Sequence, residues 1–553
     1  MLSNPVVSRE LLGLLRTRRS IAILAAVAVA FSLLIIARWP SDGVVDLSGA
    51  TSRDVFRVFA YSLTAAVALL VPVFPSTSIV QEKQTGTLAL LLNSPMGPVS
   101  IYLGKLIAAL GFVLLLLSAT LPATAACFTL GGVSLFDEVL PLYLVLAITS
   151  VLFTTWSLLV STAAMTTDGA VRGTFGGVLV LFLLVLLPHY FLDGSESSLA
   201  GIAAILRNVS PVPAIMDIVG HADVGSRQLV SQNSGVATFA LFGGMLSLLF
   251  AGMTVGRLNQ TLLDRARSQG NVTDDRAAGV RVFRRLMFLI DPQRRKTGIG
   301  PLTNPVMVKE FRSRQFGRLH WLLRIVGGCA IVSLGLAFAA TLGSEEWGVE
   351  TIGGIIVSMQ AALIVLFTPS LASGLISSER ESGSWELLRM TPLSASRIVR
   401  GKLLSVVWTL LILLMASLPG YGVMIWIKPI LEEQIIQVLI CLAIGAVFAM
   451  LLSATVSSFF VRTAPATVAS YSILLFLWAG SLLVWLGRDA PFGYSAVQTA
   501  LSINPMAAAL SVIGTPGFES YNLIPVNWWV TGIASGFLLV VLLIQTWRIT
   551  KPE

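Results

Sequence analysis

The chain has 553 residues, of which 55% are hydrophobic and only 12% are charged. Soluble domains carry about 25% charged residues, so this composition excludes an ordinary soluble globule. The formal net charge is +9, but the basic residues do not form a domain with interleaved aromatic residues, and we expect no nucleic-acid partner.

Apolar runs divide the chain into regularly spaced segments. Each run lacks Asp, Glu, Lys and Arg and is long enough to hold a span of about 20 residues. Because lipid cannot bind exposed backbone groups, each run is expected to be helical. The runs are 20–37, 58–80, 106–130, 139–161, 173–192 and 237–256 in the first half, and 325–342, 351–373, 403–427, 434–457, 466–487 and 526–547 in the second. The sequence therefore predicts an all-α integral membrane protein with about twelve transmembrane helices.

Lysine and arginine are unevenly distributed over the connections between these runs. With the N-terminus inside, the inner flanks hold 30 of them and the outer connections hold seven. If the long connection 257–324 is left out, the inner flanks still hold 15 lysines and arginines against seven in the outer connections. Cytoplasmic loops carry the excess of basic residues in membrane proteins. We therefore expect a multi-pass protein of the cytoplasmic (inner) cell membrane with both termini in the cytoplasm.

A polar segment separates the two halves of the chain. Residues 259–300 are mixed in charge with an excess of basic residues, among them Arg284, Arg285, Arg294 and Arg295. We interpret this segment as a cytoplasmic linker that contacts anionic lipid headgroups, with a regulatory or partner-docking role as the alternative. The predicted organisation is a six-helix unit in 1–258, the linker in 259–300 and a second six-helix unit in 301–553.

The two halves repeat one another in sequence. Three segments match in order and spacing, at offsets of 300 and 297, and Ser210-Pro211 matches Asn504-Pro505 at an offset of 294. The matching segments are 4–10 (NPVVSRE) with 304–310 (NPVMVKE), 82–88 (EKQTGTL) with 379–385 (ERESGSW), and 101–106 (IYLGKL) with 398–403 (IVRGKL). Both copies enter the membrane from the same side, which predicts parallel repeats about an axis along the membrane normal.

The connection between the second and third spans is the most informative segment of each half. It begins with a charged turn, continues with Gly-Thr or Gly-Ser and a short apolar stretch, and ends at Pro95 or Pro392. This pattern predicts a short amphipathic helix along the membrane surface. From the residues alone, an interfacial helix that merely joins two spans and a docking surface for a cytoplasmic partner are equally compatible with it.

Several kinds of site have no counterpart in the sequence. Gly104-Lys105-Leu106 and Gly401-Lys402-Leu403 fail as phosphate loops, because the preceding Gly is missing and Leu stands where Ser or Thr must bind magnesium. The three histidines and the three cysteines show no metal-ligand spacing. The spans also lack the ionisable groups that ion-coupled carriers generally use, which counts against secondary transport. We expect no catalytic residue, no metal and no cofactor in this chain.

Taken in order, the repeated motifs resemble those of ABC-2-type permeases, the membrane subunits of ABC transporters. They are Asn-Pro-x-x-x-(Arg/Lys)-Glu before the first span, Glu-x-x-x-Gly-(Thr/Ser) and a Leu-rich turn after the second, and Gly-Lys at the third. The resemblance implies that separate cytoplasmic ATPase subunits, in two copies, bind ATP and dock on the connection between spans two and three. The coupling positions it implies are Glu82, Gly86, Thr87 and Pro95, with Glu379, Gly383, Ser384, Glu386 and Pro392. Ala89 stands where the second copy has Glu386, so the two docking sites are expected to be unequal.

The function implied is that of the permease subunit of an ATP-driven exporter, without an ATPase site of its own. The alternative is a non-transporting scaffold or conformational-signalling subunit linked to an ATPase. An ion-coupled carrier is the third hypothesis, weakened by the uncharged spans. Membrane lipids and further membrane subunits are the other partners considered.

Overall fold

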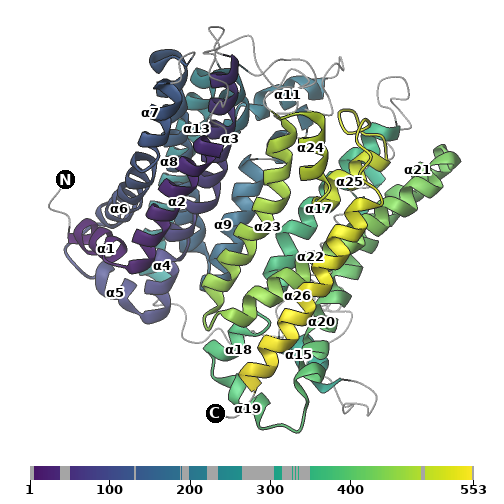
Figure 1. Ribbon diagram of the computed structural model, residues 1–553. Helices are drawn as coiled ribbons and strands as arrows, with labels where there is room; N and C mark the ends of the chain where they lie inside the picture. Colours follow the sequence, from purple (N-terminus) through teal and green to yellow (C-terminus); the bar gives the residue numbers. More distant parts are fainter. Residues whose placement is uncertain are drawn as a thin grey trace, which may run out of the picture. The chain divides into compact units, whose positions relative to one another are not determined.

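The computed structural model describes residues 5–37, 50–129, 133–182, 184–186, 188–189, 198–220, 235–264, 304–313, 349–486 and 492–550, with a few single positions between 327 and 335. All regular elements in these ranges are helices (Figure 1), which confirms the all-α prediction. The helices group into two compact units, Met1–Arg265 with Ala479–Val497, and Ala266–Trp478 with Gln498–Glu553.

Nine helices of the described part of the chain are long and apolar enough to cross a membrane, or up to ten if one bent pair counts as a span. The predicted first and fifth spans form shorter apolar helices, over Ser20–Ile36 and Gly169–Phe182. The predicted span 325–342 lies almost entirely outside the described residues. The chain is thus a multi-pass membrane protein, and the count of twelve stays a prediction.

The first unit is arranged around one long helix, α8. This helix packs against α4, α9 and α13 along its length, and also contacts α3, α6 and α12. The helices of the unit are α1 (Pro5–Leu15), α2 (Arg18–Ala37), α3 (Ala50–Leu70), α4 (Val73–Thr85), α5 (Thr87–Leu92), α6 (Pro98–Ser118), α7 (Leu121–Thr129), η1 (Leu135–Val139), α8 (Leu140–Ala163), α9 (Thr167–Phe182), η2 (Leu184–Leu186), α11 (Ser198–Arg207), α12 (Pro211–Ile218) and α13 (Gly235–Asp264).

The second unit repeats this arrangement around α22. This helix packs against α17, α25 and α26, as α8 packs against α4, α12 and α13. Its helices are α15 (Pro305–Ser313), α17 (Val349–Ala372), α18 (Ser377–Glu381), α19 (Ser384–Arg389), α20 (Ala395–Met415), α21 (Leu418–Ile427), η4 (Pro429–Leu431), α22 (Glu432–Phe459), α25 (Pro505–Val512) and α26 (Val526–Thr550). The helices α23 (Thr463–Leu486) and α24 (Tyr494–Leu501) are divided, because Ala479–Val497 groups with the first unit. The repeat found in the sequence therefore corresponds to a repeated helix order and packing.

Proline breaks one long span in each unit at the same place. Pro122 follows the break between α6 and α7, and Pro419 follows the break between α20 and α21, because proline cannot continue the backbone hydrogen-bond pattern. Neighbouring side chains then pair polar groups at the break. The Gln360 amide donates to the carbonyl of Leu414 at 3.3 Å in the second unit, and the Tyr143 hydroxyl lies 2.6 Å from the Thr124 hydroxyl in the first.

The connection after the fifth span folds into two short helices in each unit. In the first unit, the helical segments Gly201–Arg207 and Pro211–Ile218 meet at an angle of 75°. Ser210 caps α12 and also donates to the carbonyl of Phe182 at 2.8 Å, and Asn504 caps α25 and donates to the carbonyl of Trp478 at 3.0 Å. The matched Ser-Pro and Asn-Pro motifs thus hold these short helices against the end of the preceding span.

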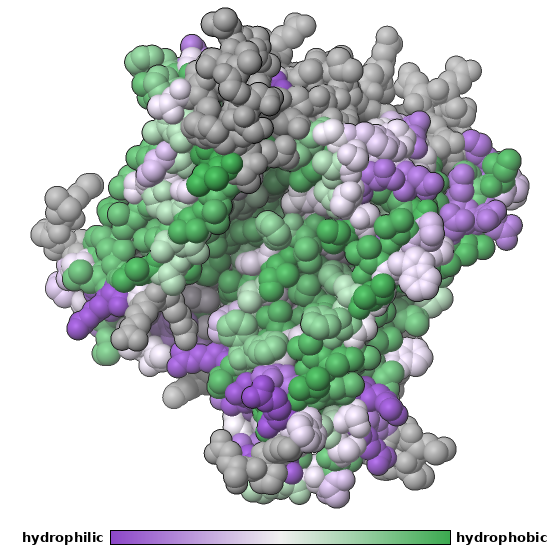
Figure 2. All heavy atoms as spheres, viewed as in Figure 1, coloured by the Kyte–Doolittle hydropathy of each residue, from purple (hydrophilic) through white to green (hydrophobic). Residues whose placement is uncertain are grey.

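The outward faces of the helices are apolar. Leu241, Met245 and Leu248 of α13 share one exposed face, as do Ile533 and Phe537 of α26. Figure 2 shows apolar side chains along the helices and hydrophilic residues gathered at their ends. A soluble protein would not expose such long apolar stripes, so these faces are suited to contact lipid chains.

Candidate functional site

The repeated motifs meet at one end of each unit. There α1 packs against α6, and α4 turns into α5; in the second unit α15 packs against α20, and α18 turns into α19. We call this the connector end of a unit, and it lies at the lower end of each unit in Figure 1. Segments that are about 95 residues apart in the sequence thus come into contact here.

Four charged side chains form one cluster at the connector end of the first unit. Arg9 donates to Glu10 at 2.7 Å and to Glu82 at 2.6 Å. The ammonium of Lys105 lies 3.1 Å from Glu10 and 3.0 Å from the second carboxylate oxygen of Glu82. The Lys105 side chain is only 2% exposed. The cluster joins α1, α4 and α6 and contains two cations and two carboxylates.

The second unit has the same cluster at the matching positions. Lys309 lies 2.6 Å from Glu379, and Lys402 lies 2.8 Å from Glu310 and 2.9 Å from the other oxygen of Glu379. Lys402 also donates to the carbonyl of Leu375 at 2.8 Å, where α17 has ended and α18 has not begun. This cluster is more deeply buried, because the Glu310 side chain is 5% exposed and that of Glu10 is 26% exposed.

Electrostatics favour the charged forms of Glu10 and Arg9 in the first cluster. Burial alone would raise the pKa of Glu10, but the Lys105 ammonium and the Arg9 guanidinium together lower it below its ordinary value. Burial would lower the pKa of Arg9, and the two glutamates raise it. The stabilisation from Glu10 is therefore present above its ordinary pKa of 4.5 and is lost as the pH falls through its lowered pKa.

A second set of contacts joins the connection between spans two and three, which we call the connector, to the central helix of its unit. The Ser161 hydroxyl accepts from the backbone N–H groups of Ile79 and Val80, both at 3.1 Å. Lys83 donates to the carbonyls of Thr162 and Ala164 at the end of α8. Such a cation at a helix C-terminus satisfies carbonyls that have no partner within the helix.

The equivalent contacts recur in the second unit. Ser457 accepts from the N–H groups of Ile376 at 3.1 Å and Ser377 at 3.0 Å. Arg380 donates to the carbonyls of Ser458 at 3.2 Å and Phe460 at 3.4 Å, at the end of α22. The connector of each unit is therefore joined to the helix before the first span, to the third span and to the central helix.

The Asn-Pro and Gly-Lys motifs contact each other directly in the second unit. Asn304 accepts from the N–H of Val306, which caps α15, and donates to the carbonyl of Arg397 at 2.9 Å. A side chain at Gly401 would meet Asn304 at 2.7 Å, so only glycine fits there without a shift. The equivalent Asn4 lies outside the described residues.

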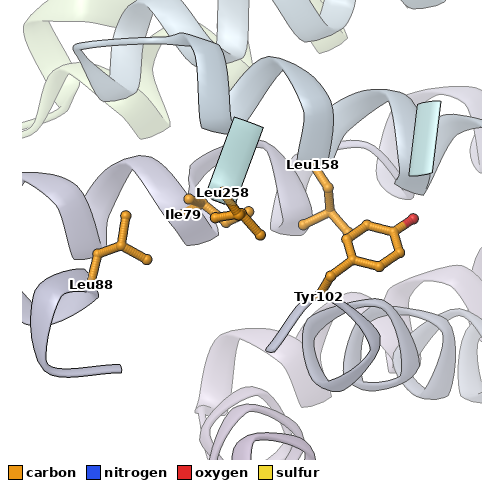
Figure 3. Packing of buried hydrophobic residues seen from close by; sticks show 5 residues of the cluster. All are labelled: Ile79, Leu88, Tyr102, Leu158 and Leu258. Carbon is orange, nitrogen blue, oxygen red and sulfur yellow. The ribbon is translucent and has the colours of Figure 1, made fainter. Parts of the chain in front are cut away.

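Leu88 anchors α5 to the first unit. It belongs to a buried cluster with Ile79, Tyr102, Leu158 and Leu258 (Figure 3), which come from α4, α6, α8 and α13. The opposite face of α5 points away from this cluster.

The side chain of Leu90 is 72% exposed. The equivalent helix α19 buries Trp385 and Leu388 and exposes Leu387 by 69%. Each short helix thus has one anchored face and one face with an exposed leucine.

The predicted coupling residues fall into two groups. Glu82 and Glu379 are buried in the ion clusters. Ser384 is half-buried. The remaining predicted residues are exposed: Gly86, Thr87, Pro95, Gly383, Glu386 and Pro392. Gly86 and Gly383 have φ angles of +77° and +73°, and each stands at the turn that starts the short helix. Their role in coupling stays a prediction.

Substituting valine for Gly86 or Gly383 is expected to lower the free energy of unfolding by about 1–2 kcal/mol. No neighbour lies within 4 Å of an added Cβ at either position, so the cost comes from the left-handed backbone alone. Thermal unfolding of the purified variants in detergent measures it. Gly97→Val is the control, because Gly97 has φ −69° and ψ 159°, which valine accepts. An equal loss in all three variants would contradict the backbone explanation.

Sequence reasoning missed the partners of the two glutamates. In the sequence, Lys105 and Lys402 stand out as parts of failed phosphate loops and of the repeated Gly-Lys motif, and Lys83 and Arg380 only as charged turn residues. The duplication contained a signal, because the acidic and basic members of the cluster recur together at matching positions. Their contact with one another follows only from the packing of α1 on α6 and of α15 on α20.

Comparison with known families agrees with this repeated architecture. Residues 267–551 match a family model described as ABC-2 family transporter protein, and residues 11–188 match a second model with the same description. No curated protein matches the chain. The matched domains are transport components and not catalytic ATPase domains. The chain therefore belongs to the ABC-2 transporter family and is the membrane component of an ABC transporter.

Proposed function

We propose that the chain is the permease subunit of an ATP-driven exporter, energised by a separate cytoplasmic ATPase subunit in two copies. The observation that carries this proposal is the pair of surface helices α5 and α19. Each short helix begins next to a buried ion cluster and carries one leucine that is about 70% exposed, Leu90 in α5 and Leu387 in α19. Exposed apolar residues on a polar end of a molecule are typical of a protein-binding site.

The contacts at the connector end suggest how force is transmitted. Movement of α5 displaces α4, because only Gly86 separates the two helices. Glu82 then passes the displacement to Lys105 on α6 and Arg9 on α1, while Ser161 and Lys83 pass it to α8. The same relations hold in the second unit. A partner that moves the short helix would thereby move several membrane helices together.

Topology supports the placement of the partner. The connector ends carry the basic flanks that the positive-inside rule assigns to the cytoplasm. In this proposal both termini are cytoplasmic, the protein lies in the cytoplasmic membrane, and ATP is bound by the partner and not by this chain. The outward apolar faces of α13 and α26 would contact membrane lipids.

Replacing both exposed leucines by serine is expected to reduce the amount of bound ATPase at least tenfold. Each substitution removes an exposed apolar side chain, and interface anchors are worth about 1–3 kcal/mol or more each. The measurement is affinity purification of the tagged chain in mild detergent, with mass spectrometry of any ATPase that carries a phosphate loop. Ile430→Ser is the control, because Ile430 is 81% exposed outside the two short helices.

Three outcomes would oppose the proposal. If no ATPase co-purifies, even after cross-linking before solubilisation, ATP-driven export is wrong. If an ATPase binds through α5 and α19, but proteoliposomes containing the complex move no substrate when ATP is supplied, the chain is a conformational-signalling subunit. Transport that follows an ion gradient without ATP would support a carrier instead.

A further inference from the structure

The two docking helices are chemically unequal, although they occupy equivalent places in their units. We infer that the ATPase is held at α19 by an ion pair between Glu386 and a basic residue of the ATPase in addition to apolar contact, and at α5 by apolar contact alone. This inference rests on the proposed function. It assigns the ATPase a lysine or arginine that pairs with Glu386 at α19 and that has no acidic partner on α5, where Ala89 takes the place of Glu386.

The charge content of the two surfaces supports this difference. Residues 84–104 of the first unit contain no Asp, Glu, Lys or Arg, and the matching residues 381–401 contain five. On the short helices themselves, Glu386 and Arg389 stand where the first unit has Ala89 and Leu92. The first docking surface is therefore uncharged throughout.

The geometry shows which of these charges is accessible to a partner. The Glu386 side chain is 63% exposed and lies on α19 next to the exposed Leu387. Arg389 is 24% exposed and lies 3.4 Å from Glu386, one turn away on the same helix. Such an exposed pair within one helix contributes little free energy, so it competes weakly with a cation of a partner. Glu381, by contrast, is already bound to the N–H of Thr463 at 2.9 Å.

Salt separates the two kinds of contact. Raising the salt concentration from about 0.15 M to about 1 M shortens the screening length from about 8 Å to about 3 Å and weakens interfacial ion pairs at partly exposed positions. Apolar contact at Leu90 and Leu387 is not screened. We therefore expect the affinity of the α19 site to fall about tenfold in 1 M NaCl, toward that of the α5 site, and the affinity of the α5 site to stay unchanged.

The test is native mass spectrometry of the complex between the full chain and its co-purified ATPase, after equilibration at increasing NaCl. At a fixed, subsaturating concentration of ATPase, the occupancy at α19 should exceed that at α5 in low salt and fall to about the same level in high salt, while the occupancy at α5 stays constant. A photoreactive side chain in place of Asn93 or Met390, which are exposed at equivalent ends of α5 and α19, reports the occupancy of each site. Glu386→Ala should lower the low-salt occupancy at α19 to its high-salt level and remove its salt response, and Ala89→Glu should give the α5 site a salt response.

The outcomes distinguish this inference from the function on which it rests. An equal salt response at both sites of the unchanged chain, or a salt response at α19 that Glu386→Ala does not alter, overturns the inference and leaves ATPase docking intact. In that case Glu386 is a solvated charge. Absence of any bound ATPase at low salt instead overturns the proposed function. A salt response at α5 with none at α19 would reverse the assignment and also contradict the inference.

Discussion

Replacing Lys402 by methionine is expected to lower the free energy of unfolding by about 3–5 kcal/mol. Lys402 is 3% exposed and is the cation shared by Glu310 and Glu379, so its removal brings two buried carboxylates together without their common counter-charge. The loss should appear as a large fall in the thermal unfolding temperature of the purified protein in detergent. The unfolding temperature of the Lys105→Met variant should fall less, because Glu10 is partly open to water.

The matched control for this substitution keeps the shape and removes all the buried charge. Substituting methionine for Glu310, Glu379 and Lys402 together should recover most of the stability, because apolar residues of similar volume replace buried ion pairs at little cost. The same triple variant should fail in transport if the cluster transmits movement. If Lys402→Met alone lowers the free energy of unfolding by less than about 1 kcal/mol, water reaches the cluster, and the cluster does not hold α15, α18 and α20 together.

The second large effect is expected at Ser457. Substituting alanine removes the acceptor of two buried N–H groups, those of Ile376 and Ser377, where α18 begins. Each donor left without a partner costs about 1–3 kcal/mol. Ser457→Ala should therefore destabilise the protein markedly, and hydrogen exchange of the Ile376 and Ser377 amides should accelerate.

A serine one turn earlier on the same helix provides the control. Ser453 is equally buried, but its hydroxyl donates to the carbonyl of Ala449 within α22, so Ser453→Ala leaves no donor unpaired. It should change the unfolding temperature only slightly. Equal effects at 453 and 457 would mean that cavity formation, and not the lost acceptor, determines the cost. The accelerated amide exchange should then be absent.

These two predictions concern different links of the same connector. The ion cluster joins it to α15 and α20, and Ser457 with Arg380 joins it to α22. A variant that breaks one link while keeping the protein folded should lower ATP-driven transport while ATPase binding at Leu387 persists. Loss of binding together with loss of transport would place the residue in the docking surface instead.

Much of the fold could be predicted from local sequence. Apolar runs without charges predict helices in a bilayer wherever the backbone has no other partner, and nine helices in the described ranges of the chain are long and apolar enough to span. The repeated motifs predicted two alike units, and the Gly-Thr and Gly-Ser turns predicted the short helices α5 and α19. These features depend on residues close together in the chain, which is why periodicity and composition suffice for them.

Other features depended on contacts between distant segments. Pro122 and Pro419 break helices whose apolar runs, 106–130 and 403–427, each predicted one continuous span. Burial likewise separates Glu82 and Glu379, which face inward, from Leu90 and Leu387, which face outward. Neighbouring residues of one short segment take opposite roles because α1, α6 and α8, or α15, α20 and α22, enclose only one side of it.

The sequence by itself determined the class of protein, the repeat and the location of the surface helices, because hydrophobic length and duplicated motifs are local properties. Only the tertiary structure decided which charges pair. Lys105 and Lys402 meet their glutamates across about 95 residues of chain, and no spacing rule connects such positions. The physical reason is that a buried charge needs a partner from whichever segment packs beside it, and the packing of helices selects that segment.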